Sequence, residues 1–248
     1  MFLCRSGVPL ILIWMLAACS GLEDDRGNPQ ASADAPAATT SAAWGCDAPQ
    51  PGHPTAAERR AFVEEVGALA TRAEERHGVP AAAITAMAIL ESGYGWTRLA
   101  QNTNNLLGWK YFSGASTGER EFWVLECPEK GTSDRFVVFR DRAEAVDFAA
   151  AQLASTDNYR ADTERYRKDR ESGVDVVEAV NRWVDGIADP YSSQPEAYRS
   201  AVRRIMADTY KLAEGRSSER NLYSLSESIS PPRAQSAQAL GEGQRPAG

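Results

Sequence analysis

The residue best suited to chemistry in this sequence is Glu91, which follows the nearly unbroken apolar run Ala81–Leu90. Such a run predicts a helix that is buried on most faces, with the carboxyl group in dry surroundings beside the negative end of the helix dipole. Both effects disfavour the ionised form and raise the pKa of a carboxyl group. A raised pKa suits a general acid that protonates a glycosidic oxygen near neutral pH. By position alone, a solvated glutamate at a helix end is the alternative interpretation.

Aromatic residues close to Glu91 in the sequence are candidates for sugar binding. The segment Ser92–Trp96 contains two glycines, which open space, and the aromatic residues Tyr94 and Trp96. Trp109 lies further along the chain. Aromatic rings can stack on sugars, so we take these three as substrate-binding candidates, with core packing as the alternative for each.

Other classes of site are disfavoured by composition. The chain has two histidines, His53 and His77, and four cysteines. These are few residues from which to build a His/Cys metal cluster or a Ser-His-Asp or Cys-His catalytic centre, so such sites are disfavoured. No glycine-rich phosphate loop is present. The formal net charge is −7 without a basic cluster, which argues against a nucleic-acid partner. We expect no metal and no cofactor.

The elements that must position Glu91 are predicted to be mostly helical. A capping box, Thr55–Glu58, starts a helix that ends at Gly78, and Pro80 starts the helix that carries Glu91. Two strands rich in valine and aromatic residues predict a hairpin. The strands are expected at Arg120–Glu126 and Arg135–Arg140, and further helices at Ala143–Ser155, Thr163–Arg170, Val174–Val184 and Pro195–Leu212. The expected fold class is therefore α+β, a mostly helical domain with one small hairpin.

The N-terminus resembles a bacterial lipoprotein signal. Arg5 is followed by the apolar run Val8–Leu16 and by Ala17-Ala18-Cys19. This pattern predicts cleavage before Cys19 and attachment of lipid to that residue. A membrane-spanning helix, the alternative, needs about 20 apolar residues, and this run is shorter. We expect a lipid-anchored protein on the periplasmic side of a bacterial membrane, the outer membrane by preference.

Composition divides the chain into four parts. Residues 1–18 are the expected signal, and 19–54, rich in Ala, Pro, Ser and Thr, are expected to form a flexible tether. The predicted domain is 55–212, and 213–248 are predicted to be disordered. Cys46 and Cys127 then remain as a pair in an oxidising compartment, where a disulfide is expected and two unpaired buried thiols are the alternative.

Three motifs occur in an order that resembles a known family. They are Ala88–Gly95 with Leu99-Ala100, then Asn104–Lys110, then Tyr191–Tyr198. This set is similar to the signature of the peptidoglycan N-acetylglucosaminidase family, glycoside hydrolase family 73, including its Bax-like branch. The resemblance covers about Pro80 to Leu212 and implies a lysozyme-like fold.

The resemblance also implies roles for individual residues. Glu91 matches the family's essential acid, and Tyr191 matches a tyrosine near the cleavage point. Asn104, Asn105 and Gly108 match the turn that shapes the wall of the cleft, although a purely structural turn is the alternative for the two asparagines.

The family's second carboxylate, in its hairpin, has no clean counterpart here. Four glutamates are candidates: Glu119, Glu121, Glu126 and Glu129. Strand periodicity places Glu126 on one face with Phe122 and Val124, and Glu121 on the other, so only one of the two can face a cleft. We favour Glu126, with Glu121 as the alternative.

Together these features predict a peptidoglycan hydrolase that cuts the GlcNAc-β-1,4-MurNAc bond. Glu91 would protonate the leaving oxygen, and water would attack with help from a hairpin carboxylate or from the substrate's own N-acetyl group. The expected partners are the glycan strands and the membrane, and the protein is expected to be a monomer. The alternatives are a lytic transglycosylase and a non-catalytic wall-binding lipoprotein.

Overall fold

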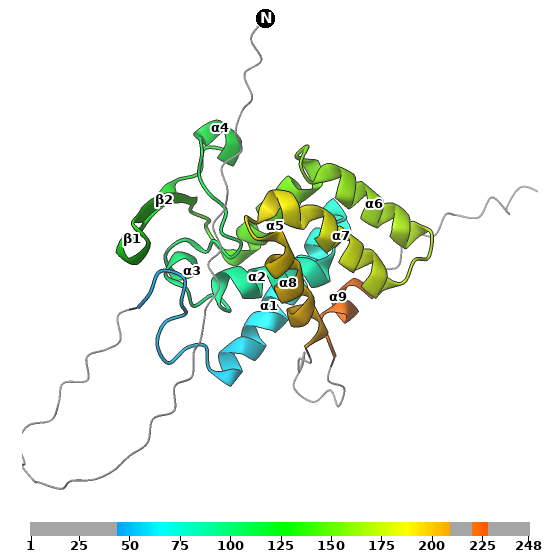
Figure 1. Ribbon diagram of the computed structural model, residues 1–248, viewed down its shortest axis with the longest axis horizontal. Helices are drawn as coiled ribbons and strands as arrows, with labels where there is room; N and C mark the ends of the chain where they lie inside the picture. The colour runs from blue at the N-terminus through cyan, green and yellow to red at the C-terminus, as the bar shows by residue number, and fades with distance from the viewer. Residues whose placement is uncertain (1–43, 209–219, 228–248) are drawn as a thin grey trace, which may run out of the picture.

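The computed structural model describes residues 44–208 and 220–227. Its helices form a body around α2 (Ala81–Ser92), and the hairpin of β1 and β2 projects from one side (Figure 1). The other elements are α1 (Ala56–His77), α3 (Arg98–Thr103), α4 (Gly114–Thr117), β1 (Phe122–Cys127), the 3-10 turn η1 (Pro128–Lys130), β2 (Thr132–Val137), α5 (Arg142–Ser155), α6 (Arg160–Glu171), α7 (Val176–Tyr191), α8 (Pro195–Ala207) and α9 (Tyr223–Glu227).

The first helix begins where the sequence predicts. The Thr55 hydroxyl accepts the Glu58 backbone N–H at 3.3 Å, and the Glu58 carboxylate accepts the Thr55 N–H at 2.7 Å. This reciprocal pair satisfies two of the amide groups that a helix start leaves free. The helix ends at Gly78, whose φ of 67° is the left-handed conformation that glycine adopts at low cost.

Helix α2 is the core element, as its composition predicts. Every residue from Ala81 to Ile89 is buried, and the helix packs against α1, α7, α8 and α9. Because the residues are small and apolar, neighbouring helices approach α2 closely on several sides. The C-terminal end of this helix, with Glu91, is therefore held by the body of the domain.

The end of the domain differs from the prediction. Residues 220–227 were assigned to a disordered tail, but Leu222 and Ser226 have 0% exposure against the helical body. The Ser226 hydroxyl donates to Glu74 at 2.8 Å and accepts from the Ala82 N–H at 3.1 Å. Glu74 also accepts the Ala81 N–H at 2.7 Å, so the segment closes the start of α2. This contact joins residues far apart in sequence, which local composition cannot reveal.

The start of the domain also lies earlier than predicted. Residues 44–54 were assigned to the flexible tether, yet Cys46 is buried and Pro49 forms an isolated bridge with Thr97. A disulfide, discussed below, holds this segment on the domain. The predicted signal, the lipid-bearing Cys19 and the remainder of the tether lie outside the described residues, as do 228–248.

The hairpin is antiparallel, with Phe122 opposite Val137 and Cys127 opposite Thr132. The second strand was predicted about three residues too late, because the turn at η1 is short and Phe139 leaves the sheet to bond Thr103. Residues 109–111 lie along the free edge of β2, where Tyr111 N–H donates to Arg135 and Val137 N–H donates to Trp109.

The remaining helices confirm a mostly helical α+β fold with one small hairpin. Helix α7 was predicted to end at Val184 but continues to Tyr191, with Pro190 inside its last turn. Helices α3 and α4 were not predicted, since both are too short to show periodicity. Within residues 44–208 and 220–227, no helix combines the length and apolarity needed to cross a bilayer.

Candidate active site

Glu91 lies in the last turn of α2, and Gly93 ends the helix with a φ of 54°. The Glu91 side chain is directed into the protein so that its Oε1 atom is buried without a hydrogen-bond partner in the described residues. Burial raises the pKa of this carboxyl group to about 8, because the charged form loses its hydration. The predicted direction of the pKa shift is thus present, and burial is its cause.

The turn that follows α3 comes close to this carboxyl group. A Cβ atom added at Gly108, which has a φ of 65°, would lie 3.5 Å from Glu91 Oε2. Glycine therefore lets the backbone pass directly beside the carboxyl group. The backbone at Gly108 thus lies beside Glu91, and a role of this turn in the wall of a cleft stays a prediction.

The two asparagines hold this turn in place. Asn105 is buried; its side-chain oxygen accepts the Trp109 N–H at 2.9 Å, and its side-chain nitrogen donates to the carbonyls of Trp109 at 2.9 Å and Val137 at 3.1 Å. Asn104 donates to the carbonyl of Phe139 at 3.0 Å. These amides are engaged by backbone groups and hold the turn that passes Glu91, whereas their place in the wall of a cleft and their contact with substrate stay predictions.

Tyr191 joins the same region from the end of α7. Its hydroxyl donates to the Leu107 carbonyl at 2.7 Å, which ties α7 to the turn beside Glu91. Burial, and then the negative charge of Glu91, raise the pKa of Tyr191 well above its usual value. The structure therefore brings together Glu91, Gly108 and Tyr191, which are far apart in the sequence.

Tyr198 is a member of this group that we did not predict as a site residue. Its ring centroid lies 5.3 Å from that of Tyr191, and its side chain is buried. Burial first, and then Tyr191 and Glu91, raise the pKa of its hydroxyl. The final tyrosine of the Tyr191–Tyr198 motif was the available signal, but the resemblance was used to assign a role only to Tyr191.

The three candidate sugar-binding aromatics are partly buried against other rings. Tyr94 contacts the edge of Phe62 with centroids 5.8 Å apart, Trp96 stacks on His53 at 3.9 Å, and Trp109 meets Phe148 at 5.6 Å. Each has a packing role, and a further role in binding sugar stays a prediction.

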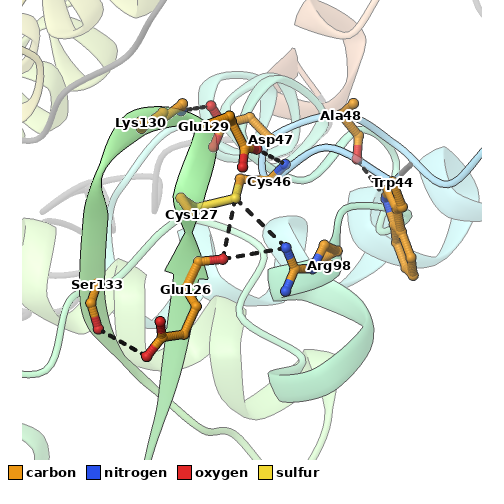
Figure 2. The surroundings of a disulfide bond; sticks show 10 residues. All are labelled: Trp44, Cys46, Asp47, Ala48, Arg98, Glu126, Cys127, Glu129, Lys130 and Ser133. Atoms are coloured by element: carbon orange, nitrogen blue, oxygen red, sulfur yellow. Dashed lines mark hydrogen bonds and ion pairs between the residues drawn. A yellow bond between two sulfur atoms is a disulfide. The ribbon is translucent and has the colours of Figure 1, made fainter. Parts of the chain in front are cut away.

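The hairpin glutamates lie as strand periodicity predicts. Trp123 and Leu125 face the apolar cluster around Cys46 and Leu99, whereas Glu126 is on the exposed face. Its carboxylate accepts the Ser133 hydroxyl at 3.4 Å (Figure 2). Glu121 is also exposed but precedes the strand. This arrangement does not test whether Glu126 or Glu121 acts on substrate, so the choice of Glu126 stays a prediction.

A disulfide joins Cys46 to Cys127, with Cα atoms 5.7 Å apart (Figure 2). Around it, the Cys46 N–H donates to Glu129 at 2.8 Å and Lys130 forms an ion pair with Asp47. The N-terminal segment is thus attached to the turn end of the hairpin.

The same segment continues to the turn that follows Glu91. The Gln50 N–H donates to the Trp96 carbonyl at 2.9 Å, and a Cβ atom added at Gly93 would lie 2.6 Å from Pro49 Cγ. Residues 44–54 therefore connect the hairpin to the end of α2. The sequence predicted the disulfide but not this second attachment.

The described residues contain no group of three or more His, Cys, Asp or Glu side chains arranged to hold a metal ion. The chemistry available at Glu91 is that of a single buried carboxyl group whose pKa is raised to about 8. Such a group can donate a proton to a leaving oxygen.

Comparisons with known proteins place this arrangement in context. The family profile named Glucosaminidase, described as mannosyl-glycoprotein endo-beta-N-acetylglucosaminidase, matches residues 67–211. A comparison with curated protein sequences found no match.

Three solved structures are similar in part. One is an N-acetylmuramoyl-L-alanine amidase from Staphylococcus aureus, with 15% identity and a TM-score of 0.46 over 72% of this chain and 46% of that one. This chain therefore spans less than half of that protein. The catalytic domain of the autolysin Auto from Listeria monocytogenes shows 18% identity and a TM-score of 0.41, covering 61% and 89% of the two chains. A glycoside hydrolase domain of FlgJ from Salmonella typhimurium shows 21% identity and a TM-score of 0.40, covering 60% and 99%.

Proposed function

Because this chain belongs to the glucosaminidase family of glycoside hydrolases, we propose that it hydrolyses the GlcNAc-β-1,4-MurNAc bond of peptidoglycan with Glu91 as the acid. The observation that carries this proposal is the burial of the Glu91 carboxyl group and the raised pKa that follows from it. Burial raises its pKa to about 8, so at neutral pH it holds the proton that a leaving oxygen requires.

In the proposed reaction the Glu91 proton passes to the glycosidic oxygen as the bond from that oxygen to C1 of GlcNAc breaks. Positive charge develops on the sugar ring. Water then attacks C1, and its proton passes either to Glu126 or, if the N-acetyl carbonyl of the substrate attacks first, to the Glu91 carboxylate during ring opening. Tyr191 would act at the same centre by holding the Leu107 carbonyl and hence the turn beside Glu91.

The test is digestion of purified sacculi by the wild-type protein and by Glu91→Gln, followed by mass spectrometry of the released sugar ends. Exposed Glu64 on α1 provides the matched control, Glu64→Gln. We expect GlcNAc reducing ends from the wild type and the control. Glu91→Gln should lose about 100-fold or more of the rate, since a required acid is removed.

The outcomes separate the alternatives. A folded Glu91→Gln variant that keeps more than roughly a tenth of the activity would remove Glu91 as the acid. Anhydro-MurNAc ends would identify a lytic transglycosylase. Binding to sacculi without release of any sugar by the wild-type protein would identify a wall-binding lipoprotein.

A pair of hairpin variants tests the second carboxylate. Glu126 shares its strand face with Phe122 and Val124, and Glu121 has the opposite parity. Glu126→Gln is expected to lower turnover sharply while Glu121→Gln does not, with equal melting temperatures for both. If both variants keep the wild-type rate, the hairpin supplies no base and assistance by the substrate's N-acetyl group replaces it.

We also propose that the protein is anchored by lipid on Cys19 and faces the periplasm, from the signal pattern that precedes that residue. Mass spectrometry of the mature N-terminus tests this. A diacylglyceryl-cysteine is expected in the wild type, and its absence, or membrane attachment that survives Cys19→Ala, would refute the anchor.

A further inference from the structure

An exposed arginine on the hairpin lies over two aromatic rings. The Arg135 guanidinium is 5.7 Å from the ring centroid of Tyr111 and 5.2 Å from that of Phe122, and the two rings are 5.0 Å apart. Stacking of this type limits the freedom of the side chain and leaves its N–H groups available at the edge.

Arg135 is also unlike many arginines of this protein. Arg76 and Arg182, for example, form ion pairs with Asp147 and Glu178. Within the part of the chain that the structure describes, Arg135 has no carboxylate partner at ion-pair distance. The nearby carboxylates are engaged elsewhere.

Two acidic groups illustrate this point. Asp134, the neighbour of Arg135 in β2, pairs with Lys110 on the other face of the sheet at 3.1 Å. Glu126 shares the face of Arg135, but its carboxylate accepts from Ser133. Neither carboxylate forms an ion pair with Arg135, so its guanidinium N–H groups are available for a ligand carboxylate.

The same face is apolar around the charge. Phe122 is 45% exposed and Val124, which pairs with Arg135 across the strands, is 37% exposed. Flat apolar rings beside a cation suit a ligand that has both a sugar face and an acidic group.

This face is connected directly to the candidate active site. Gly108, which lies against Glu91, is followed by residues 109–111 along the edge of β2, where the Tyr111 N–H donates to the Arg135 carbonyl at 2.9 Å. At about 3.3 Å per extended residue, Tyr111 is about 10 Å along the chain from Gly108. A polymer with one bond at Glu91 has neighbouring units within reach of Arg135.

We propose that Arg135, together with Tyr111 and Phe122, binds a carboxylate of the polymer next to the bond that is cut. This inference rests on the proposed function and deepens it, because it predicts a preference for an acidic glycan over a neutral one. In peptidoglycan a carboxylate can come from the lactyl group of a bare MurNAc or from the peptide that this group carries. The chain has a net charge of −7, so a local cation is needed to hold such a group.

The experiment measures binding to the Glu91→Gln protein, in which turnover is removed, with and without Arg135→Gln. Three ligands of equal length are compared: glycan oligomers with peptides, the same oligomers without peptides but with free lactyl carboxylates, and neutral chitooligosaccharides. Exposed Arg72 on α1 provides the matched control, Arg72→Gln. Circular dichroism and melting temperature verify that each variant is folded.

Loss of Arg135 is expected to weaken binding of a carboxylate ligand about tenfold and to leave neutral ligands within about twofold, as a lost charge-assisted hydrogen bond predicts. An effect confined to peptide-free oligomers assigns the lactyl carboxylate, and one confined to peptide-bearing oligomers assigns the peptide. Arg135→Lys keeps the charge but loses the planar stack. Its affinity for carboxylate ligands should therefore lie between that of the protein with Arg135 and that of Arg135→Gln.

Equal weakening of all three ligands, or none, would overturn the inference. Failure of the proposed function is distinguishable, because it appears as a wild-type protein that releases no sugar from sacculi. An Arg135 effect that is confined to acidic ligands would remain valid in that case.

Discussion

Replacement of Glu91 by glutamine is expected to remove activity and also to change how stability depends on pH. In the folded protein, burial raises the pKa of this carboxyl group from 4.5 to about 8. Between these two pH values the folded state holds a proton that the unfolded state has lost. Stability of the wild-type protein therefore falls as pH rises through this window, and glutamine removes that contribution.

The magnitude follows from the width of the window. With one pKa unit equal to about 1.4 kcal/mol, the wild-type protein loses about 3 kcal/mol of unfolding free energy between pH 5 and pH 8 through this group. The buried Oε1 atom lacks a partner in the wild-type protein as well, so the unpaired oxygen does not distinguish the two proteins. The variant is thus expected to be about as stable as the wild type near pH 5, where both side chains are neutral, and more stable near pH 8.

The assay is urea unfolding of the wild type and Glu91→Gln at pH 5, 6, 7 and 8, with the exposed-site control Glu64→Gln. The decisive quantity is the difference in unfolding free energy between Glu91→Gln and the wild type as a function of pH. A difference that stays constant from pH 5 to pH 8 would show that the Glu91 carboxyl group is not perturbed by burial. The wild-type rate should also decline as pH rises through about 8, where the acid loses its proton.

Three further changes test the structure around the site. Replacing both Cys46 and Cys127 by serine should lower the unfolding free energy by about 4 kcal/mol, because the disulfide closes a long loop; a reductant should reproduce this in the wild type but leave the variant unchanged. Leu222→Ala should cost about 3 kcal/mol in urea unfolding, since the side chain is fully buried, and an unchanged midpoint would mean that residues 220–227 do not pack on the domain. Gly108→Ala should cost about 1 kcal/mol through its positive φ, and an unchanged urea midpoint would contradict the left-handed conformation at this position.

The C-terminal segment shows why part of the fold escapes sequence reasoning. Residues 213–248 are polar, which predicts disorder. Nevertheless Ser226 contacts Glu74, and Tyr166 donates to the same carboxylate at 2.5 Å. These contacts form only when three segments meet at the start of α2. A sequence pattern within any one of the segments therefore cannot predict them.

The asparagines of the predicted motif show the same limit at the site. The resemblance assigned Asn105 to the turn that shapes the wall of the cleft, and in the structure its amide is used by the backbone at Trp109 and Val137. The presence of a polar residue in a motif does not reveal which of its atoms remain free for a ligand. The position of Arg135 over two rings likewise depends on the pairing of residues 109–111 with β2.

The sequence by itself determined the features that depend on neighbouring residues. The capping box at Thr55, the buried helix that ends in Glu91 and the two faces of β1 all follow from local hydrogen bonding and periodicity. The tertiary structure alone decided which distant groups meet. It placed Gly108 and Tyr191 beside Glu91 and joined residues 44–54 to both the hairpin and the end of α2, because burial and close packing are properties of the assembled chain.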